Sequence, residues 1–122
     1  MPNEPEGVKA PIRVRFTPGF KRNLRRLARK YRHIKSDIEP LIKEIEAGGL
    51  PGDQIPRAKD EIYKARVVNS DLQRGKSGGY RVIYSVETPT QRVLVTVYSK
   101  TEQADVTMEE LRRIIKEVDR EV

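Results

Sequence analysis

The sequence predicts an α+β fold of two layers, in which an N-terminal strand and a helical hairpin pack on a small, mostly antiparallel sheet and a C-terminal helix completes the domain. Apolar residues alternate with polar ones, as in half-buried strands, over residues 12–17, 62–68, 80–86 and 92–98. Three longer stretches show helical spacing instead. The last three strands follow one another with no helix between them, which favours an antiparallel meander.

Length and composition limit the possible functions. A chain of 122 residues is too short for two domains of usual size, so we expect a flexible lead-in at residues 1–11 and one domain at residues 12–122. The net charge of +7 favours a polyanion or an acidic protein as partner. Because the chain has no cysteine and only one histidine, His33, we expect no metal and no cofactor. It has no apolar run of roughly 20 residues and no signal pattern, so we expect a cytoplasmic protein without a membrane partner.

The first two helices are predicted to form a hairpin on one sheet face. Thr17 is the expected N-cap of the first helix, with Pro18 at its first position. For the second helix we expect a capping box from Ser36 to Glu39, with Pro40 in the first turn. Between positions 21 and 35 the first helix and the link carry eight Lys or Arg residues and no acidic one. This run is either a solvated face or a nucleic-acid contact, for which the candidates are Arg22, Arg25, Arg26 and Arg29.

The three later strands carry the candidate functional residues. Residues 50–60 are expected to form a loop that leads to the second strand, where Lys64 and Arg66 share one face. In the third strand Arg81 should be half buried, which indicates either an internal ion pair or an anion site. In the fourth strand the valines at 93, 95 and 97 are expected on one face and Leu94, Thr96 and Tyr98 on the other. Three tyrosines are expected to pack in the sheet rather than to stack on bases: Tyr63, Tyr80 and Tyr84.

Two further segments complete the chain. The turn at residues 69–79 carries Arg74 and Lys76, which either contact a nucleic-acid backbone or solvate the turn. It is not a Walker loop, because the position of the first glycine is occupied by Ser70. The C-terminal helix is predicted to start with a capping box from Thr107 to Glu110. Its apolar stripe completes the core or receives a partner: Met108, Leu111, Ile115 and Val118.

This order of elements, together with Tyr63-Lys64-Ala65-Arg66, Ser77-Gly78-Gly79-Tyr80-Arg81-Val82-Ile83-Tyr84 and Tyr98-Ser99-Lys100, resembles the RelE/ParE superfamily of toxins from bacterial type II toxin–antitoxin systems. The likeness extends from residue 12 to residue 118 and is greatest to the RelE-like or HigB-like branch. It implies a RelE-like fold and a toxin that enters the ribosomal A site, cuts the bound mRNA and so inhibits translation. Such an mRNA interferase would have the ribosome, mRNA and a cognate antitoxin as partners.

Carried over by position, the resemblance implies phosphate-binding or catalytic roles for five residues: Lys64, Arg66, Arg81, Tyr98 and Lys100. RelE-like chains often have a functional tyrosine after the last strand. The corresponding segment here, Ala104-Asp105-Val106-Thr107, has none, and Tyr98 is the available substitute.

RNA cleavage by its own 2′-hydroxyl needs a base, cations around the phosphorus and an acid at the 5′-oxygen. Arg66 and Arg81 suit the cation role, because guanidinium stays charged. Lys64 is the predicted base because neighbouring cations disfavour its ammonium form, with Glu102 and Glu87 as rivals. Tyr98 or Lys100 would donate the proton, and the endoribonuclease would need no metal. Two alternatives remain: a ParE-like inhibitor of DNA gyrase without nuclease activity, and a non-catalytic RNA-binding module.

Overall fold

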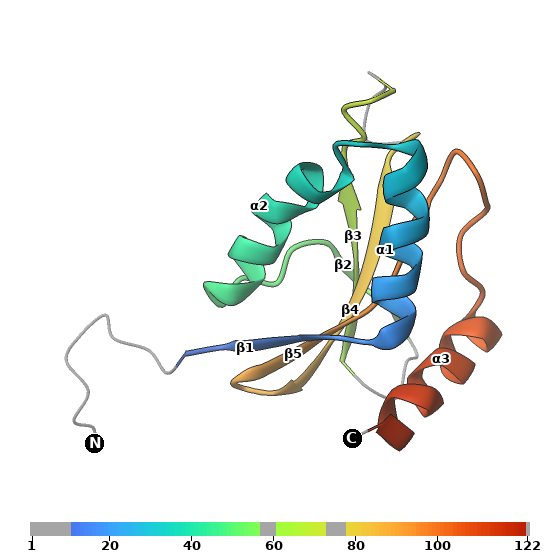
Figure 1. The fold of residues 1–122 in the computed structure, drawn as a ribbon. Coiled ribbons are helices and arrows are strands. Elements are labelled where there is room, and N and C mark those ends of the chain that lie inside the picture. The colour runs from blue at the N-terminus through green and yellow to red at the C-terminus, as the bar shows by residue number, and fades with distance from the viewer. Residues whose placement is uncertain (1–10, 57–60, 73–77, 122) are drawn as a thin grey trace.

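The computed structural model describes residues 11–56, 61–72 and 78–121, with the side chains of residues 117–121 excepted. Three helices surround a five-stranded sheet of order β1-β5-β4-β3-β2, so the predicted α+β class is confirmed (Figure 1). The elements follow along the chain as β1 (Arg13–Phe16), α1 (Pro18–Lys30), α2 (Ile34–Glu46), β2 (Asp53–Gln54), β3 (Ile62–Val67), β4 (Tyr80–Thr88), β5 (Gln91–Ser99) and α3 (Met108–Glu121).

The predicted antiparallel meander is formed by β3, β4 and β5. β1 joins β5 in parallel and makes one edge of the sheet. The other edge is β2, which lies inside the segment expected to be only a loop and pairs Asp53 with Lys64. Gly52 permits this approach, because its φ is +91° and a Cβ there would lie 2.8 Å from Ala65 Cα.

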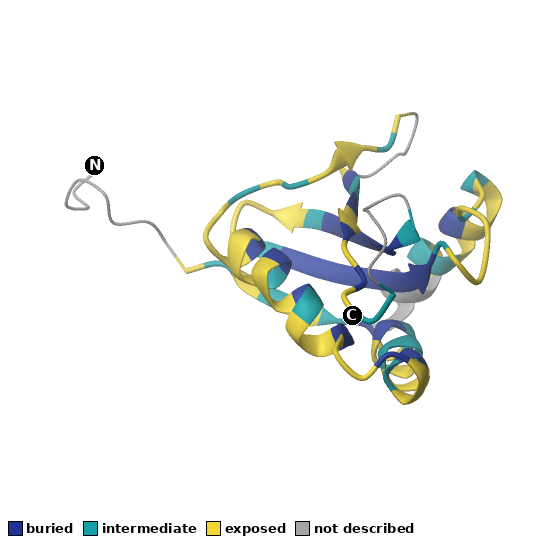
Figure 2. Cartoon of the chain, turned by 90° about the horizontal axis from the view of Figure 1, so that it is seen from above, coloured by how far each residue is buried: buried dark blue, intermediate teal, exposed yellow. Residues whose placement is uncertain are grey.

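The helical hairpin packs on one face of the sheet, as predicted. Phe20 and Leu27 of α1 and Ile38 and Ile45 of α2 are at most 2% exposed and share one apolar core with the sheet. The strands contribute Ala65, Val67, Tyr80, Val82, Tyr84, Leu94 and Val97. In Figure 2 the central strands are dark blue along most of their length, whereas the helices carry yellow on their outer sides.

The opposite face of the sheet is covered in part by α3. Leu111 is 3% exposed and packs with Ile62, Ile83, Val93, Val95 and Tyr98 in a second apolar cluster. Met108, Ile114 and Ile115 lie partly buried against it. The predicted stripe therefore completes the core; the side chain of Val118 lies outside the described residues. Among the described helices, none has the length and apolar character needed to cross a bilayer.

Two of the three predicted helix starts are confirmed. The Thr17 hydroxyl accepts from the Phe20 N–H at 2.9 Å, and Pro18 opens α1. Thr107 and Glu110 form the reciprocal capping box of α3, with the Glu110 N–H donating to Thr107 Oγ1 at 3.1 Å.

The start of α2 was predicted wrongly. The helix begins at Ile34 with His33 as its N-cap, so Pro40 lies inside it and not in the first turn. Ser36 belongs to the first turn and donates its hydroxyl to the His33 carbonyl at 2.9 Å.

A β-bulge in β5 corrects the expected alternation of that strand. Ile83 pairs with Thr96 but Tyr84 pairs with Leu94, so Val95 is the extra residue. Beyond the bulge the two faces exchange: Val97 packs with the helical hairpin and Tyr98 packs on the α3 face. The prediction had placed Tyr98 on the same face as Leu94.

Candidate functional site

Three predicted site residues form one row across the centre of the sheet. Arg66 of β3 is the cross-strand partner of Arg81 of β4, which is in turn the partner of Tyr98 of β5. Directly opposed residues in a sheet project from the same face. Since Tyr98 belongs to the second apolar cluster, which includes Leu111 of α3, the row lies on the face of the sheet that α3 covers.

A carboxylate absent from the prediction, Asp105, joins the remaining site residues to this row. Asp105 Oδ1 lies 3.7 Å from Lys64 Nζ, and Oδ2 lies 3.4 Å from Lys100 Nζ. The Tyr98 hydroxyl donates to Oδ1 at 3.0 Å and accepts from the Val106 N–H at 3.4 Å. The structure therefore brings Lys64, Tyr98 and Lys100 together around one carboxylate, and Tyr98 reaches the segment 104–107 in which the sequence lacks a tyrosine.

The protonation of this group follows from its surroundings. Burial raises the pKa of Tyr98 to about 12, and the Asp105 carboxylate that accepts a hydrogen bond from its hydroxyl also contributes to the rise. Burial acts to raise the pKa of Asp105 as well, but the Tyr98 hydroxyl and the two lysines outweigh it and hold that pKa below its ordinary value. At neutral pH the site therefore contains a neutral phenol and an ionised carboxylate.

The environment of Lys64 differs from the one on which its predicted role depended. That prediction considered only the neighbouring cations, which disfavour an ammonium. The structure adds Asp105 at 3.7 Å and places Asp53 as the cross-strand neighbour of Lys64. The charges around Lys64 are therefore mixed, and its ammonium is paired with a carboxylate rather than surrounded by cations alone.

The two arginines differ in access. Arg66 is exposed, whereas Arg81 is 5% exposed and donates from Nη1 to the Tyr80 carbonyl at 3.1 Å. Arg81 had been expected to be half buried and is buried more deeply. The accessible cations of the site are accordingly Arg66, Lys64 and Lys100.

Both rival carboxylates lie in other ion pairs. Glu87 pairs with Arg15 of β1 at 3.3 Å, at the far end of β4 from Arg81. Glu102 pairs with Arg26 and Lys30 of α1, each at 3.3 Å. Asp105 is therefore the carboxylate that contacts the cation cluster in the described part of the chain.

The remaining basic candidates fall into two groups. Arg22, Arg25, Arg26 and Arg29 are all exposed on α1, although Arg26 shares Glu102 with Lys30. Arg74 and Lys76 lie outside the described residues. Among the residues described, no group of His, Cys, Asp and Glu is arranged to hold a metal ion.

The tyrosines near the site pack as predicted. Tyr80 and Tyr84 are fully buried, and Tyr63 stacks on Tyr84 with ring centroids 5.4 Å apart. The Tyr84 hydroxyl donates to the Pro51 carbonyl at 2.6 Å, and burial raises the pKa of Tyr84 well above its ordinary value. These rings support the sheet and do not form a platform for bases.

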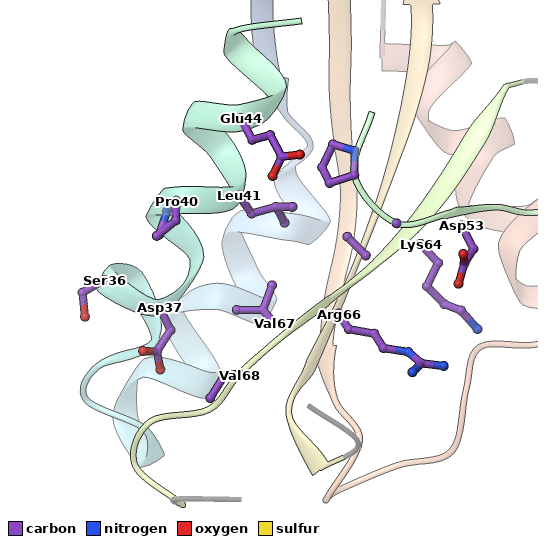
Figure 3. A pocket seen from close by; sticks show the side chains of 13 residues that line it. Ser36, Asp37, Pro40, Leu41, Glu44, Asp53, Lys64, Arg66, Val67 and Val68 are labelled. Carbon is purple, nitrogen blue, oxygen red and sulfur yellow. The ribbon is translucent and has the colours of Figure 1, made fainter. Parts of the chain in front are cut away.

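A groove of about 700 Å³ runs between α2 and β3. Pro40 and Leu41 line it from the helix, and residues 64–68 line it from the strand. Figure 3 shows that the Lys64 and Arg66 side chains leave β3 on the side away from α2. Lys64 and Arg66 thus belong both to the lining of the groove and to the cation cluster.

The sequence prediction did not include Asp105, because the family resemblance implies a tyrosine in this segment and not a carboxylate. One signal was available in the sequence. Asp105 lies in the short stretch between Lys100 and the capping box of α3, and so short a connection keeps its carboxylate near the end of the sheet.

Comparison with known proteins gives the family. A search of curated proteins found no similar sequence. The family model described as the RelE toxin of the RelE/RelB toxin–antitoxin system matches residues 20–120, which is most of the chain and includes every residue of the cation cluster. The chain therefore belongs to the RelE toxin family and is a toxin of a toxin–antitoxin system, with an antitoxin as its partner.

Proposed function

We propose that this toxin is a metal-independent endoribonuclease that cuts mRNA on the ribosome and thereby inhibits translation in the cytoplasm. The observation that carries the proposal is the convergence of Lys64, Tyr98 and Lys100 on one point beside the exposed Arg66. A single-stranded phosphodiester is an anion of suitable size for such a cluster, and lysine and arginine are the residues that bind phosphate.

In the reaction the 2′-oxygen would attack the phosphorus while the 2′-hydroxyl proton passes to a solvent water or hydroxide, and the bond from phosphorus to the 5′-oxygen would break. Negative charge grows on the phosphoryl oxygens, where Arg66, Lys64 and Lys100 would stabilise it. The leaving 5′-oxygen needs a proton. We assign proton donation to Tyr98, because burial raises the pKa of its phenol to about 12 and so keeps the proton on it at neutral pH. Lys64 is assigned to phosphate binding rather than to the base role that the sequence suggested.

A second candidate is a gyrase inhibitor of the ParE type, without chemistry of its own. The burial of Arg81 and the internal pairing of both lysines favour it, because a catalytic cation needs access to its substrate. The placement of Tyr98 favours cleavage, since a binding surface has no need of a buried phenol directed at a carboxylate.

The antitoxin would cover the cation cluster or lie beside α3 with an acidic or apolar segment. The net charge of +7 and the exposed α1 arginines support an acidic partner. The same α1 arginines would contact ribosomal RNA when the toxin is free.

The test is to map the 5′ ends of cellular mRNA after expression of the toxin. The wild type should produce new ends within codons at the ribosomal A site. Arg66→Ala should reduce these cuts about a hundredfold, because it removes one preorganised charge from the transition state. Arg13→Ala is the matched control, since Arg13 is also an exposed strand arginine but lies at the β1 edge. Intact mRNA, or equal loss in both variants, would contradict the proposal.

A further inference from the structure

We infer that Asp105 occupies the place of an RNA phosphodiester in the unbound toxin, and that RNA must displace this carboxylate to enter. The identity of the ligand rests on the function proposed above. The placeholder role itself rests on the contacts of Asp105. Its two oxygens face two lysines from different segments and one phenol, as two phosphoryl oxygens of RNA would.

The carboxylate is held loosely enough to be exchanged. The side chain of Asp105 is 46% exposed, and its contacts with Lys64 and Lys100 are ion pairs of 3.7 and 3.4 Å. Partly exposed ion pairs of this kind are weak, because water competes for both charges. Asp105 also lies between β5 and α3 in residues 104–107, which form neither helix nor strand. Its removal from the cluster therefore requires no element of the fold to open.

The cluster is only partly satisfied by Asp105. Arg66 follows Lys64 by two residues, so both side chains project from the same face of β3 (Figure 3). Among the described residues, none forms an ion pair or hydrogen bond with the Arg66 side chain. A phosphodiester entering here would replace Asp105 at the lysines and would also use Arg66, which gives it the advantage over the internal carboxylate.

This arrangement has a physical benefit for a binding site. Two ammonium groups and an arginine within one face repel one another when no anion is present. Asp105 reduces that repulsion in the free protein and keeps the lysines and the Tyr98 hydroxyl assembled. It acts through these residues, so it is a positioning residue and not a catalytic one.

The test measures the affinity of the full-length toxin for a short single-stranded 2′-O-methyl RNA, which cannot be cleaved through its 2′-oxygen. Asp105→Asn removes the charge and keeps an oxygen for the Tyr98 hydroxyl. It should bind this RNA roughly fivefold more tightly, the equivalent of one charge interaction across about 4 Å of water. The slope of log affinity against log salt should also steepen by about 0.7 for each lysine that is freed.

Two variants serve as controls. Glu39→Gln makes the same change in net charge by breaking a lysine pair of 3.4 Å on α2, away from the cluster. It should leave affinity and salt slope unchanged. Asp105→Glu retains the charge and should bind RNA as the wild type does. An equal gain in Glu39→Gln, or no gain in Asp105→Asn, would overturn the inference.

A measurement on the wild type avoids dependence on the folding of any variant. The Asp105 carboxyl can be titrated by carbon NMR, free and with the same RNA bound. In the free toxin its pKa should lie below the ordinary value, because the Tyr98 hydroxyl and the two lysines outweigh burial. RNA that displaces Asp105 should raise this pKa, whereas an unchanged pKa in the saturated complex would overturn the inference.

Failure of the inference and failure of the proposed function are separable in the binding assay. If the double variant Lys64→Ala, Arg66→Ala binds the RNA as tightly as the wild type, the RNA does not use this cluster and the proposed function fails. If the double variant loses binding while Asp105→Asn matches the wild type, the cluster binds RNA and only the placeholder role is wrong.

Discussion

The role of each residue in the cation cluster depends on the group it faces. In the sequence alone, nothing distinguishes Lys64 and Lys100 from ordinary surface lysines. In the structure, each Nζ lies within 3.7 Å of a carboxylate oxygen of Asp105. Tyr98 donates to that carboxylate and cannot donate elsewhere until the carboxylate moves. Protonation and access at the site are therefore linked through a single side chain, Asp105.

Substitution of Lys64 separates the two roles that this residue has been given. Lys64→Arg keeps a permanent positive charge but has no group that can act as a base near neutral pH. If Lys64 binds phosphate, this variant should retain most of the single-turnover cleavage rate, and Lys64→Ala should lose about a hundredfold. A loss in Lys64→Arg as large as that in Lys64→Ala would restore the role of base.

Tyr98 should lower the stability of the fold at alkaline pH. Its folded pKa of about 12 lies above the ordinary value of 10.0, so its contribution is fully present below pH 10 and is lost as the pH rises through 12. The loss should amount to about 2 kcal/mol in the free energy of unfolding. In Tyr98→Phe, the fall in the free energy of unfolding at alkaline pH, measured by urea unfolding, should be smaller than in the wild type. The fall that remains would come from Tyr80 and Tyr84, whose pKa values burial also raises. Identical pH profiles for the two proteins would contradict this.

At the level of elements, strands, helices and most faces were predictable from the sequence because local patterns determine them. The alternation in residues 62–67 and the Thr17 and Thr107 caps depend on neighbours in the chain. The bulge at Val95 does not, since it arises from pairing with β4. Because the bulge exchanges the two faces of β5, it brings Tyr98 to Arg66 and Arg81. This step of site formation could not be read from periodicity.

The start of α2 was missed for a related reason. Ser36 and Glu39 match a capping box, but tertiary contacts extend the helix further toward its N-terminus. Ile34 is completely buried in the hairpin core. The neighbouring His33 N–H donates to Asp71 Oδ2 at 3.0 Å, a partner that follows β3 in the sequence. Long-range packing therefore overrode a local signal.

Thr107 and Ser36 provide a matched test of where α3 and α2 begin. Thr107→Ala should cost about 1 kcal/mol in the free energy of unfolding, because it removes the acceptor for the Glu110 N–H. Ser36→Ala should cost less than about 0.5 kcal/mol, since Ser36 lies within the first turn and caps no N–H. Chemical denaturation of both variants checks this. A greater loss in Ser36→Ala would mean that α2 begins where the sequence alone suggested.

At the scale of the whole molecule, the fold gathers the side chains around Asp105 from segments far apart in the sequence. Lys64 comes from β3, Tyr98 from β5 and Lys100 from the segment that leads to α3. The helical hairpin covers the opposite face and leaves its own arginines outside. Under the proposed function, the α1 arginines would hold ribosomal RNA while an mRNA phosphate occupies the cluster.

The most direct test uses purified toxin, ribosomes carrying a defined mRNA, and DNA gyrase in parallel reactions. The wild type should cut the mRNA only when it is bound to the ribosome, and Arg66→Ala should lose about a hundredfold in rate while Arg13→Ala does not. Supercoiling by gyrase should be unaffected by the wild type. Intact mRNA on the ribosome together with inhibited gyrase would contradict the assignment of this cation cluster to RNA cleavage.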